Sequence, residues 1–297
     1  MSTPVMFNRR LRADELEEWL DFQENNTKGR HVNKNLATQF LNLPDSIAFV
    51  SSVEDDIVGG TSIYRDKTRL GMMLASVAVR EIDRDKIAYH IIKTSLPFMK
   101  TVAIRDVDAL VSDDIDVNRL DFPLSFELDS WTKDTLEKIG FHEISKLHHY
   151  SFDLEQEIEF KGASEGWDVI ADREGAKQLI WDVAKELGLT TSLVWASLDF
   201  SSFRKTLRTV SVEGKVRLCI SYDKIGKSII IGLLVVDPNV PYGEIMHHIS
   251  NILSESDVKT IHLPLIGQGQ RMLMEEIAHN FGGTLKSRTM TLMRKHL

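Results

Sequence analysis

Hydrophobic and polar positions along the chain follow two periods, and each period predicts one type of element. Apolar residues recur at three- and four-residue spacing in segments such as 14–24 (DELEEWLDFQE), which predicts an amphipathic helix. They recur at every second position in segments such as 216–222 (VRLCISY), which predicts a half-buried strand. The pattern therefore predicts a chain that mixes helices and strands along its whole length.

The first half of the chain predicts two helices and three strands, followed by a helix, a strand, a helix and a strand. Pro44 ends the second helix, because proline lacks the N–H that a helix interior needs. The expected ranges are helices 14–24 and 35–43, strands 47–53, 58–64 and 70–79, helix 87–99, strand 107–112, helix 130–139 and strand 143–152.

The second half repeats this order of elements. Its expected ranges are helices 176–187 and 203–207, strands 210–212, 216–222 and 228–236, helix 242–253, strand 260–265, helix 271–281 and strand 285–293. An order shared by two halves, without a short period, predicts duplication of a whole domain. We therefore expect an N-terminal domain at 1–153, an acidic linker rich in small residues at 154–166, and a C-terminal domain at 167–297.

Composition agrees with two soluble domains. The 297 residues are 42% hydrophobic and 27% charged, as in ordinary globular proteins. The longest apolar run, 229–236, is too short to span a bilayer, and the N-terminus lacks an apolar signal core. Cys219 is the single cysteine, so no internal disulfide can form, and its alternating neighbours predict a buried thiol. We expect a cytoplasmic protein that does not contact a membrane.

Charge is distributed unevenly between the halves. Residues 1–160 contain 19 Lys and Arg against 29 Asp and Glu, whereas residues 161–297 contain 17 against 15. Nucleic acid selects basic surfaces, so an acidic half argues against it as a partner. The charge is compatible with a cationic small molecule or an amine-bearing peptide, although a solvated acidic surface is the simpler explanation.

The element order and the segment 136–141 (LEKIGF) resemble the GCN5-related N-acetyltransferase (GNAT) family, whose helix-to-strand ending is of the type L-Y-E-K-L-G-F. The resemblance covers most of both halves. It implies an α/β fold (α+β mixed sheet) made of two tandem GNAT-like acyl-CoA N-acyltransferase folds. In that family the fourth strand runs into a helix through a glycine-rich turn of the type V-x-P-E-Y-R-G-K-G-I-G, whose backbone N–H groups hold the pyrophosphate of acyl-CoA.

Both halves depart from this turn. In the first half (79–89), Glu81 keeps the acidic position, but Asp83 and Lys86 stand where the family has Arg or Gln and the first glycine. In the second half, 236–243 (VDPNVPYG) keeps the valine, a proline and a nearby glycine, but loses the acidic residue and the paired glycines. Leu136 stands where many relatives have a tyrosine that acts as general acid.

The resemblance implies a cofactor site in the first half. Glu81 matches a position where some relatives use glutamate to accept the proton of the amine, although its charge also simply favours a helix start. Arg84 and Lys86 could replace the lost glycine contacts with cationic contacts to phosphate, or they are solvated turn charges. The remaining cofactor-binding positions that the resemblance implies are Val77, Val79, Ile87, Ala88 and Tyr89.

Asp113 and Asp114 follow the strand at 107–112, where relatives hold the acceptor, and could bind a cationic amine or form an acidic surface loop. The segment 117–129 could form a wall over the acceptor or an added strand. The adjacent histidines 148–149 and 247–248 point apart in either type of element, so no metal site is expected. The turn 267–270 (GQGQ) lacks the Lys-Ser/Thr of a P-loop.

These observations predict an acyl-CoA-dependent N-acyltransferase that moves an acetyl or other acyl group from CoA to the amine of a small molecule or peptide. The first half is the expected catalytic copy, because it keeps Glu81, Ile87 and Ala88 in register. The alternative is a non-catalytic pair of GNAT-like folds that binds a metabolite or a partner. Aminoacyl transfer of the Fem type fits the acidic first half less well, and a homodimer is left open.

Overall fold

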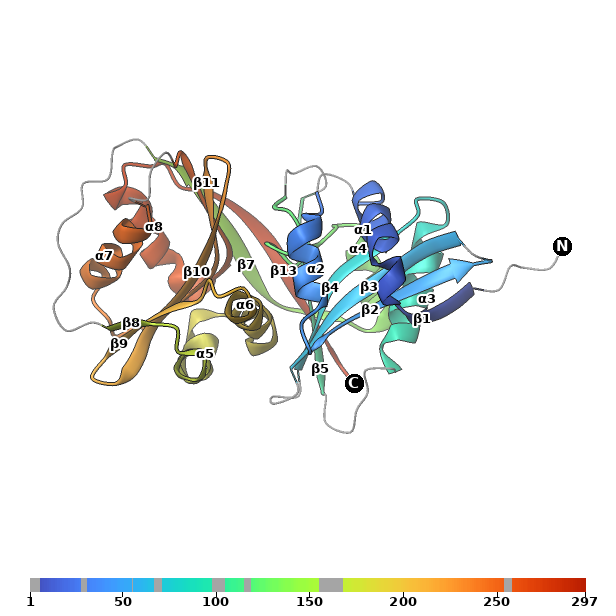
Figure 1. Cartoon of the computed structure of the whole chain (residues 1–297), viewed down its shortest axis with the longest axis horizontal. Helices are drawn as coiled ribbons and strands as arrows, with labels where there is room; N and C mark the ends of the chain where they lie inside the picture. The colour runs from blue at the N-terminus through green and yellow to red at the C-terminus, as the bar shows by residue number, and fades with distance from the viewer. Residues whose placement is uncertain are drawn as a thin grey trace. The chain divides into compact units, whose positions relative to one another are not determined.

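The structure is a computed structural model of the chain, and it describes residues 6–27, 31–54, 56–66, 71–97, 105–114, 119–154, 168–253 and 258–297. The chain forms two compact units, each of which contains strands and helices (Figure 1). The first unit combines Met1–Ser145 with Met290–Leu297, and the second comprises Lys146–Thr289. No helix of the described part is both long and apolar enough to cross a membrane.

The first unit is built on a mixed sheet with the strand order β1-β2-β3-β4-β5-β13, in which β4 and β5 are parallel. A short strand, β6, pairs with β5 off this path. Its elements are β1 (Met6–Arg10), η1 (Ala13–Glu15), α1 (Leu16–Asn25), α2 (Lys34–Leu41), β2 (Ser46–Val53), β3 (Asp56–Asp66), β4 (Gly71–Val79), α3 (Arg84–Ser95), β5 (Asp106–Ser112), β6 (Glu127–Leu128), α4 (Thr132–Ile139) and the end of β13 (Lys286–His296).

Helices cover both faces of this sheet. Ala78 of β4 packs in one apolar cluster with Trp19 of α1, and the next residue, Val79, packs in another with Ala88 and Ile91 of α3. Successive strand residues point to opposite faces, so α1 and α3 lie on opposite sides. The first unit is therefore a helix–sheet–helix sandwich.

The second unit has the same architecture, with the strand order β7-β12-β11-β10-β9-β8 and a parallel β11–β12 pair. In Figure 1, α7 and α8 lie on one side of its sheet and α5 and α6 on the other. Its elements are β7 (His142–Asp153), β8 (Asp168–Ile170), α5 (Arg173–Leu187), α6 (Thr191–Phe203), β9 (Arg208–Val212), β10 (Lys215–Ile225), β11 (Ser228–Val236), α7 (Tyr242–Leu253), β12 (Thr260–Gly267), η3 (Gln268–Gln270) and α8 (Arg271–Asn280).

The last predicted strand of each half is used by the other unit. Within the second unit, β7 pairs antiparallel with β12, and within the first unit β13 pairs with β5 from Met290 to His296. The unit boundaries therefore differ from the predicted split at 153 and 167, because a hydrophobic pattern identifies a strand but not the sheet it joins. The predicted linker, 154–166, lies outside the described residues from position 155 on.

The predicted order of the longer elements is confirmed, with one wrong helix. Residues 203–207 are not a helix: α6 ends at Phe203 and β9 begins at Arg208. The real helix, 191–203 (TSLVWASLDFSSF), is buried on nearly all sides and so shows no polar stripe for periodicity to detect. Two short strands, β1 and β8, were not predicted, and β6 confirms the added strand that was one alternative for 117–129.

Candidate functional site: two strand gaps

Each unit contains a pair of parallel strands that separates midway. Strands β4 and β5 pair only as far as Leu74 and Ala109, although both continue beyond these residues. Strands β11 and β12 pair only as far as Ile230 and His262, and both also continue. We call the resulting openings the first gap, between β4 and β5, and the second gap, between β11 and β12.

A bulge explains why the strands separate. Ala75 of β4 has no partner in β3, whereas the residues on both sides of it are paired. On β11, Ile231 and Gly232 together face the single residue Tyr222 of β10. An extra residue bends a strand and increases its twist, and both bulges lie directly after the last β4–β5 or β11–β12 pair. The gaps are therefore built into the backbone of both units.

The first gap is filled by the chain itself. Strand β6 pairs with β5 through Leu110↔Glu127 and Val111↔Leu128, beyond the point where β4 leaves β5. The other edge of β5 is taken by β13, so β6 lies on the side of β4, which it also contacts. Glu127 and Leu128 are both buried. The opening in which the resemblance places the CoA arm is closed in the first unit.

The junction between β4 and α3 forms without glycine. Asp83 adopts the left-handed conformation, with φ of 56°, which short polar residues tolerate better than most others. The carboxylate of Glu81 lies 3.3 Å from the guanidinium of Arg84 and is mostly exposed. That guanidinium also lies 5.1 Å from the ring centre of Trp131, and the ammonium of Lys86 lies 3.4 Å from Asp83. The charged residues of this junction thus interact with one another.

The other predicted cofactor-binding residues lie beside this junction but mostly face the core. Val77, Val79 and Ala88 are buried, and Ile87 is partly buried against the Val79–Ala88 cluster. Tyr89 is half-exposed, and its hydroxyl accepts a hydrogen bond from the ammonium of Lys93 at 3.1 Å. The structure therefore gathers the predicted set at one junction without placing an open strand gap between them.

The two predicted acceptor residues lie at the exposed end of β5. Asp113 accepts a hydrogen bond from the hydroxyl of Thr291. The backbone N–H of Asp114 donates to the hydroxyl of Ser112 at 3.3 Å, which closes a tight turn. The local geometry is that of a structured loop with two exposed carboxylates.

The second gap contains no added strand in the described part of the second unit. One side chain spans it: Gln270 donates from Nε2 to the carbonyl oxygen of Leu234 at 2.8 Å and accepts from the N–H of Gly267 at 3.2 Å. At the bulge, a Cβ added to Gly232 would have no atom within 4 Å, whereas Ala75 of the first bulge is fully buried. The second gap therefore keeps free space at its bulge.

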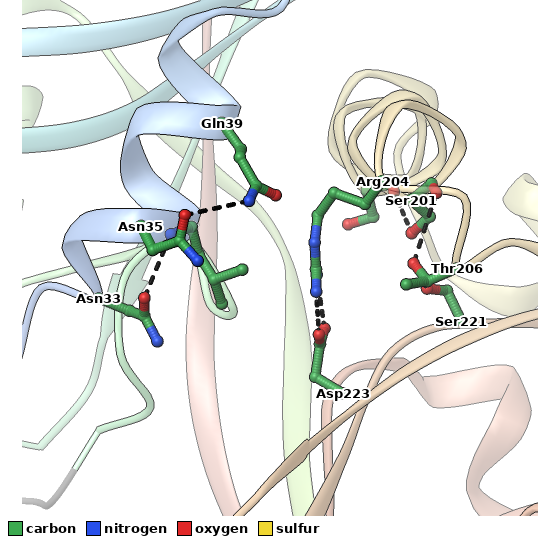
Figure 2. A network of polar contacts seen from close by, with 10 residues as sticks. Asn33, Asn35, Gln39, Ser201, Arg204, Thr206, Ser221 and Asp223 are labelled. Carbon is green, nitrogen blue, oxygen red and sulfur yellow. Dashed lines mark hydrogen bonds and ion pairs between the residues drawn. The ribbon is translucent and has the colours of Figure 1, made fainter.

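Two contacts fix the end of α6 to β10 on either side of the bulge, as Figure 2 shows. Arg204 forms a paired salt bridge with Asp223, with Nη1 at 2.8 Å from Oδ2. The hydroxyls of Thr206 and Ser221 lie 2.8 Å apart. Residues 221 and 223 flank Tyr222, which faces the bulge, so these contacts hold the backbone in place there.

A hydrogen-bonded group of histidines begins at the narrow end of the second gap. His262 belongs to the last β11–β12 pair, and its Nδ1 lies 3.2 Å from Nε2 of His149 on β7. Nε of Arg288 donates to Nδ1 of His149 at 3.1 Å. Burial, aided by the charge of Arg288, lowers the pKa of His149 to about 3. Burial also lowers the pKa of His262.

Sequence reasoning missed this group because its members lie on three strands. His149 and His262 are 113 positions apart, so no spacing connects them. At His149, sequence spacing draws attention only to the adjacent pair 148–149. Among the residues that the structure describes, no three His, Cys, Asp or Glu side chains gather as metal ligands.

Two further cavities lie beside these elements. One of about 540 Å³, in the first unit, is lined by the later part of α3, the end of α4 and the end of β13, including Lys93, Lys138 and Lys295. Another of about 430 Å³, in the second unit, is lined by α5, the start of β10 and Asp237. The carboxylate of Asp237 is held by Arg217 and by the N–H of Asn239, so it is already neutralised.

Comparison with known proteins identifies the fold. No protein-family model matches the sequence, and no curated protein matches it. Among solved structures, a candidate acetyltransferase from Pyrococcus horikoshii is 14% identical with a TM-score of 0.65, covering 100% of this chain and 91% of its own. A tandem GNAT protein from the clavulanic acid biosynthesis pathway is 13% identical with a TM-score of 0.64, covering 98% of each chain. A GCN5-related N-acetyltransferase from Sphaerobacter thermophilus is 11% identical with a TM-score of 0.60, covering 98% and 95%. The chain therefore has the tandem GNAT fold that its element order predicts.

Proposed function

We propose that the protein is an acyl-CoA-dependent N-acyltransferase that binds acyl-CoA, with acetyl-CoA as the simplest case, at the second gap. The observation that carries this proposal is the bulge at Gly232, where the β11–β12 pair separates and space for a side chain stays free. No strand of the described second unit enters this gap. The fold supports acyl transfer as the reaction class, because its structural neighbours include N-acetyltransferases.

The first unit then has a supporting role. Strand β6 fills its gap, so the arm of acyl-CoA would have to displace buried Glu127 and Leu128. Charged groups at its helix start interact among themselves, as in the Glu81–Arg84 pair. We therefore place the reaction in the second unit rather than the first. Asp113 and Asp114 belong to the first unit and do not hold the acceptor.

The junction after β11 offers a place for the diphosphate. Helix α7 begins at Tyr242, and a helix start presents unpaired N–H groups and a favourable dipole to an anion. Gly243 has no atom within 4 Å of an added Cβ, so the backbone is accessible there. The turn contains Pro238 and Pro241 in place of the paired glycines, so its contacts to phosphate involve fewer N–H groups.

Gln270 bonds to the backbone of the second gap when no ligand is bound. Its carboxamide donates to the carbonyl oxygen of Leu234, and buried backbone carbonyls need such donors. An amide N–H of the incoming arm can replace this donor. The exchange costs little, because one hydrogen bond, worth about 1 kcal/mol net, is replaced by another.

The reaction needs positioning more than covalent help from the protein. The nitrogen of the amine forms a bond to the acyl carbon, the carbon–sulfur bond breaks, and the amide and free CoA thiol are the products, with one proton passing from nitrogen to sulfur through solvent. Holding the two reactants together in an oriented, water-poor gap supplies most of the acceleration. The acceptor is an amine of a small molecule or a peptide.

Thermal unfolding with acetyl-CoA tests this proposal. A ligand that binds only the folded protein raises its stability by RT ln(1 + [L]/Kd), about 2.7 kcal/mol at 100-fold excess over Kd. We expect acetyl-CoA to raise the melting temperature of the wild type and of Gly232→Ala, and not that of Gly232→Leu, whose side chain fills the free space. Lys86→Glu, at the first junction, is the matched control and keeps the full shift.

The same variants separate the proposal from its rivals. If acetyl-CoA raises the melting temperature of Gly232→Leu but not that of Lys86→Glu, the acyl-CoA site lies in the first unit. No shift with acetyl-CoA or CoA in the wild type would contradict the proposal and favour the non-catalytic alternative. Release of CoA thiol with a panel of amines, at rates lowered in Gly232→Leu, distinguishes a transferase from a protein that only binds CoA.

A further inference from the structure

The imidazole of His262 lies where the second gap opens. It belongs to the last residue pair before β11 and β12 separate, opposite Ile230 and directly before the bulge. Its strand neighbours Ile261 and Leu263 point into the core formed with α7 and α8. Since side chains alternate along a strand, His262 points to the opposite face. Nε2 of His262 has no hydrogen-bond partner among the described residues, and the side chain is only partly buried.

The hydrogen bonds assign the position of each proton in this group. Arg288 can only donate, so Nδ1 of His149, at 3.1 Å, must accept. A neutral imidazole has one N–H, so the proton of His149 is on Nε2 and is donated to Nδ1 of His262 at 3.2 Å. The proton of neutral His262 is therefore on Nε2, the nitrogen without a protein partner.

Burial, aided by nearby cations, lowers the pKa of both rings and keeps them neutral. Burial and the nearby cation of Arg288 lower the pKa of His149 to about 3. Burial lowers the pKa of His262, and Arg288 and Lys286 add to the effect while Asp153 opposes it. At neutral pH the hydrogen bonds therefore all run in one direction. They lead from the cation of Arg288 through His149 to the Nε2–H of His262. A cation at one end polarises such a chain and makes the terminal N–H a stronger donor.

We propose that Nε2–H of His262 donates a hydrogen bond to the acyl carbonyl oxygen at the second gap, with His149 and Arg288 as positioning residues that fix its proton. This inference rests on the proposed function. When the amine bonds to the acyl carbon, an electron pair moves to that oxygen, and it returns as the carbon–sulfur bond breaks. A preorganised donor stabilises the charge on oxygen meanwhile. His262 keeps its proton throughout, and the proton of the amine leaves to solvent.

Isotope-edited infrared difference spectroscopy tests the contact without an acceptor. We would record the carbonyl stretch of acetyl-CoA labelled with carbon-13 at the carbonyl, free and bound to the protein. A hydrogen bond to the oxygen weakens the C=O bond, so the wild type should shift the stretch to lower frequency. His262→Gln, which keeps an N–H donor, should retain part of the shift, and His262→Phe should lose it. Arg288→Met should give a smaller shift than the wild type, because the proton of His149 is no longer fixed.

The outcomes distinguish failure of this inference from failure of the proposed function. If bound acetyl-CoA has the same carbonyl frequency in the wild type and in His262→Phe, the inference is wrong and the proposed function stands. No bound acetyl-CoA in the wild type overturns the proposed function. His262→Leu repeats the test if the Phe variant does not fold, as judged by circular dichroism. An undiminished shift in Arg288→Met would overturn the positioning role.

Discussion

Single residues distinguish the strand gaps of the two units. Gly232 leaves space at the bulge of β11, whereas its counterpart in β4, Ala75, is fully buried. Sequence patterns did not reveal this difference, because glycine and alanine are both compatible with a strand. Patterns did predict that Cys219 is buried, since this follows from the alternation of its neighbours. Contacts between distant residues, such as His149 with His262, could not be predicted from spacing.

Because His149 is buried as a neutral ring, we expect the stability of the folded protein to fall at acidic pH. Its pKa is about 3 in the folded protein against 6.5 in an unfolded chain, so below pH 6.5 the unfolded chain binds a proton that the folded protein does not. Stability should therefore fall as pH decreases from 6.5 toward 3, by about 2 kcal/mol at pH 5 from this residue. Arg288 and His262 face the ring, and neither can neutralise a charged His149.

Urea unfolding of the wild type and His149→Gln at pH 7 and pH 5 checks this. Glutamine can accept from Arg288 and donate to His262 but does not titrate. We expect a smaller loss of stability between the two pH values in the variant. Equal losses in both proteins would show that His149 does not cause the acid sensitivity.

The thiol of Cys219 should be inert in the native protein. It is fully buried, and burial raises its pKa to about 12, so almost no thiolate exists at neutral pH. Incubation with a disulfide reagent such as DTNB should give no reaction in native buffer and one equivalent of product in urea. Rapid labelling of the native protein would contradict the buried position.

Elements repeat between the halves, but one short strand distinguishes them. The order of long helices and strands was predictable, because each carries a period of its own. Strand β6 has only two residues, which is too short to show the two-residue alternation of a strand. An added strand was therefore only one of two alternatives for the segment 117–129. Helix α6 was missed because it lacks a polar face. The element that closes the first gap was therefore among the least visible in the sequence.

Leu128 of β6 should contribute to stability and not to acyl-CoA binding. Its side chain is 2% exposed, and truncation to alanine leaves a cavity that costs about 2–5 kcal/mol. We expect Leu128→Ala to lower the melting temperature and keep the full shift with acetyl-CoA. The control is Ile82→Ala at the first junction, where the side chain is 76% exposed and truncation should change stability by less than about 0.5 kcal/mol. A lost ligand shift in Leu128→Ala alone would assign binding to the first gap.

Across the whole chain, the two units share their strands. Met290–His296, at the end of β13, pair with β5 and so belong to the first unit, although they lie in the second half of the sequence. Strand β7 lies in the first half of the sequence but pairs with β12 in the second unit. A hydrophobic pattern identifies each strand but not its pairing partner, so this exchange cannot be predicted from the sequence. It also makes each unit depend on sequence from both halves.

Met293 provides a test of this exchange. It is fully buried in the apolar cluster of the first unit with Val107 and Ala109. Met293→Ala should cost about 2–5 kcal/mol, and the loss should fall on the first unit. Hydrogen exchange should become faster in β5 and stay unchanged in β10. Met272→Ala, on an exposed residue of α8, is the control. Faster exchange confined to β10 and β11 would contradict the strand assignment.

Hydrogen exchange of the wild-type protein with and without acetyl-CoA decides between the two gaps in one measurement. Binding at the second gap should slow exchange in residues 231–243, which comprise the bulge, the end of β11 and the start of α7, and leave residues 77–89 unchanged. Slower exchange in 77–89, or in neither segment, would contradict the placement of acyl-CoA in the second unit.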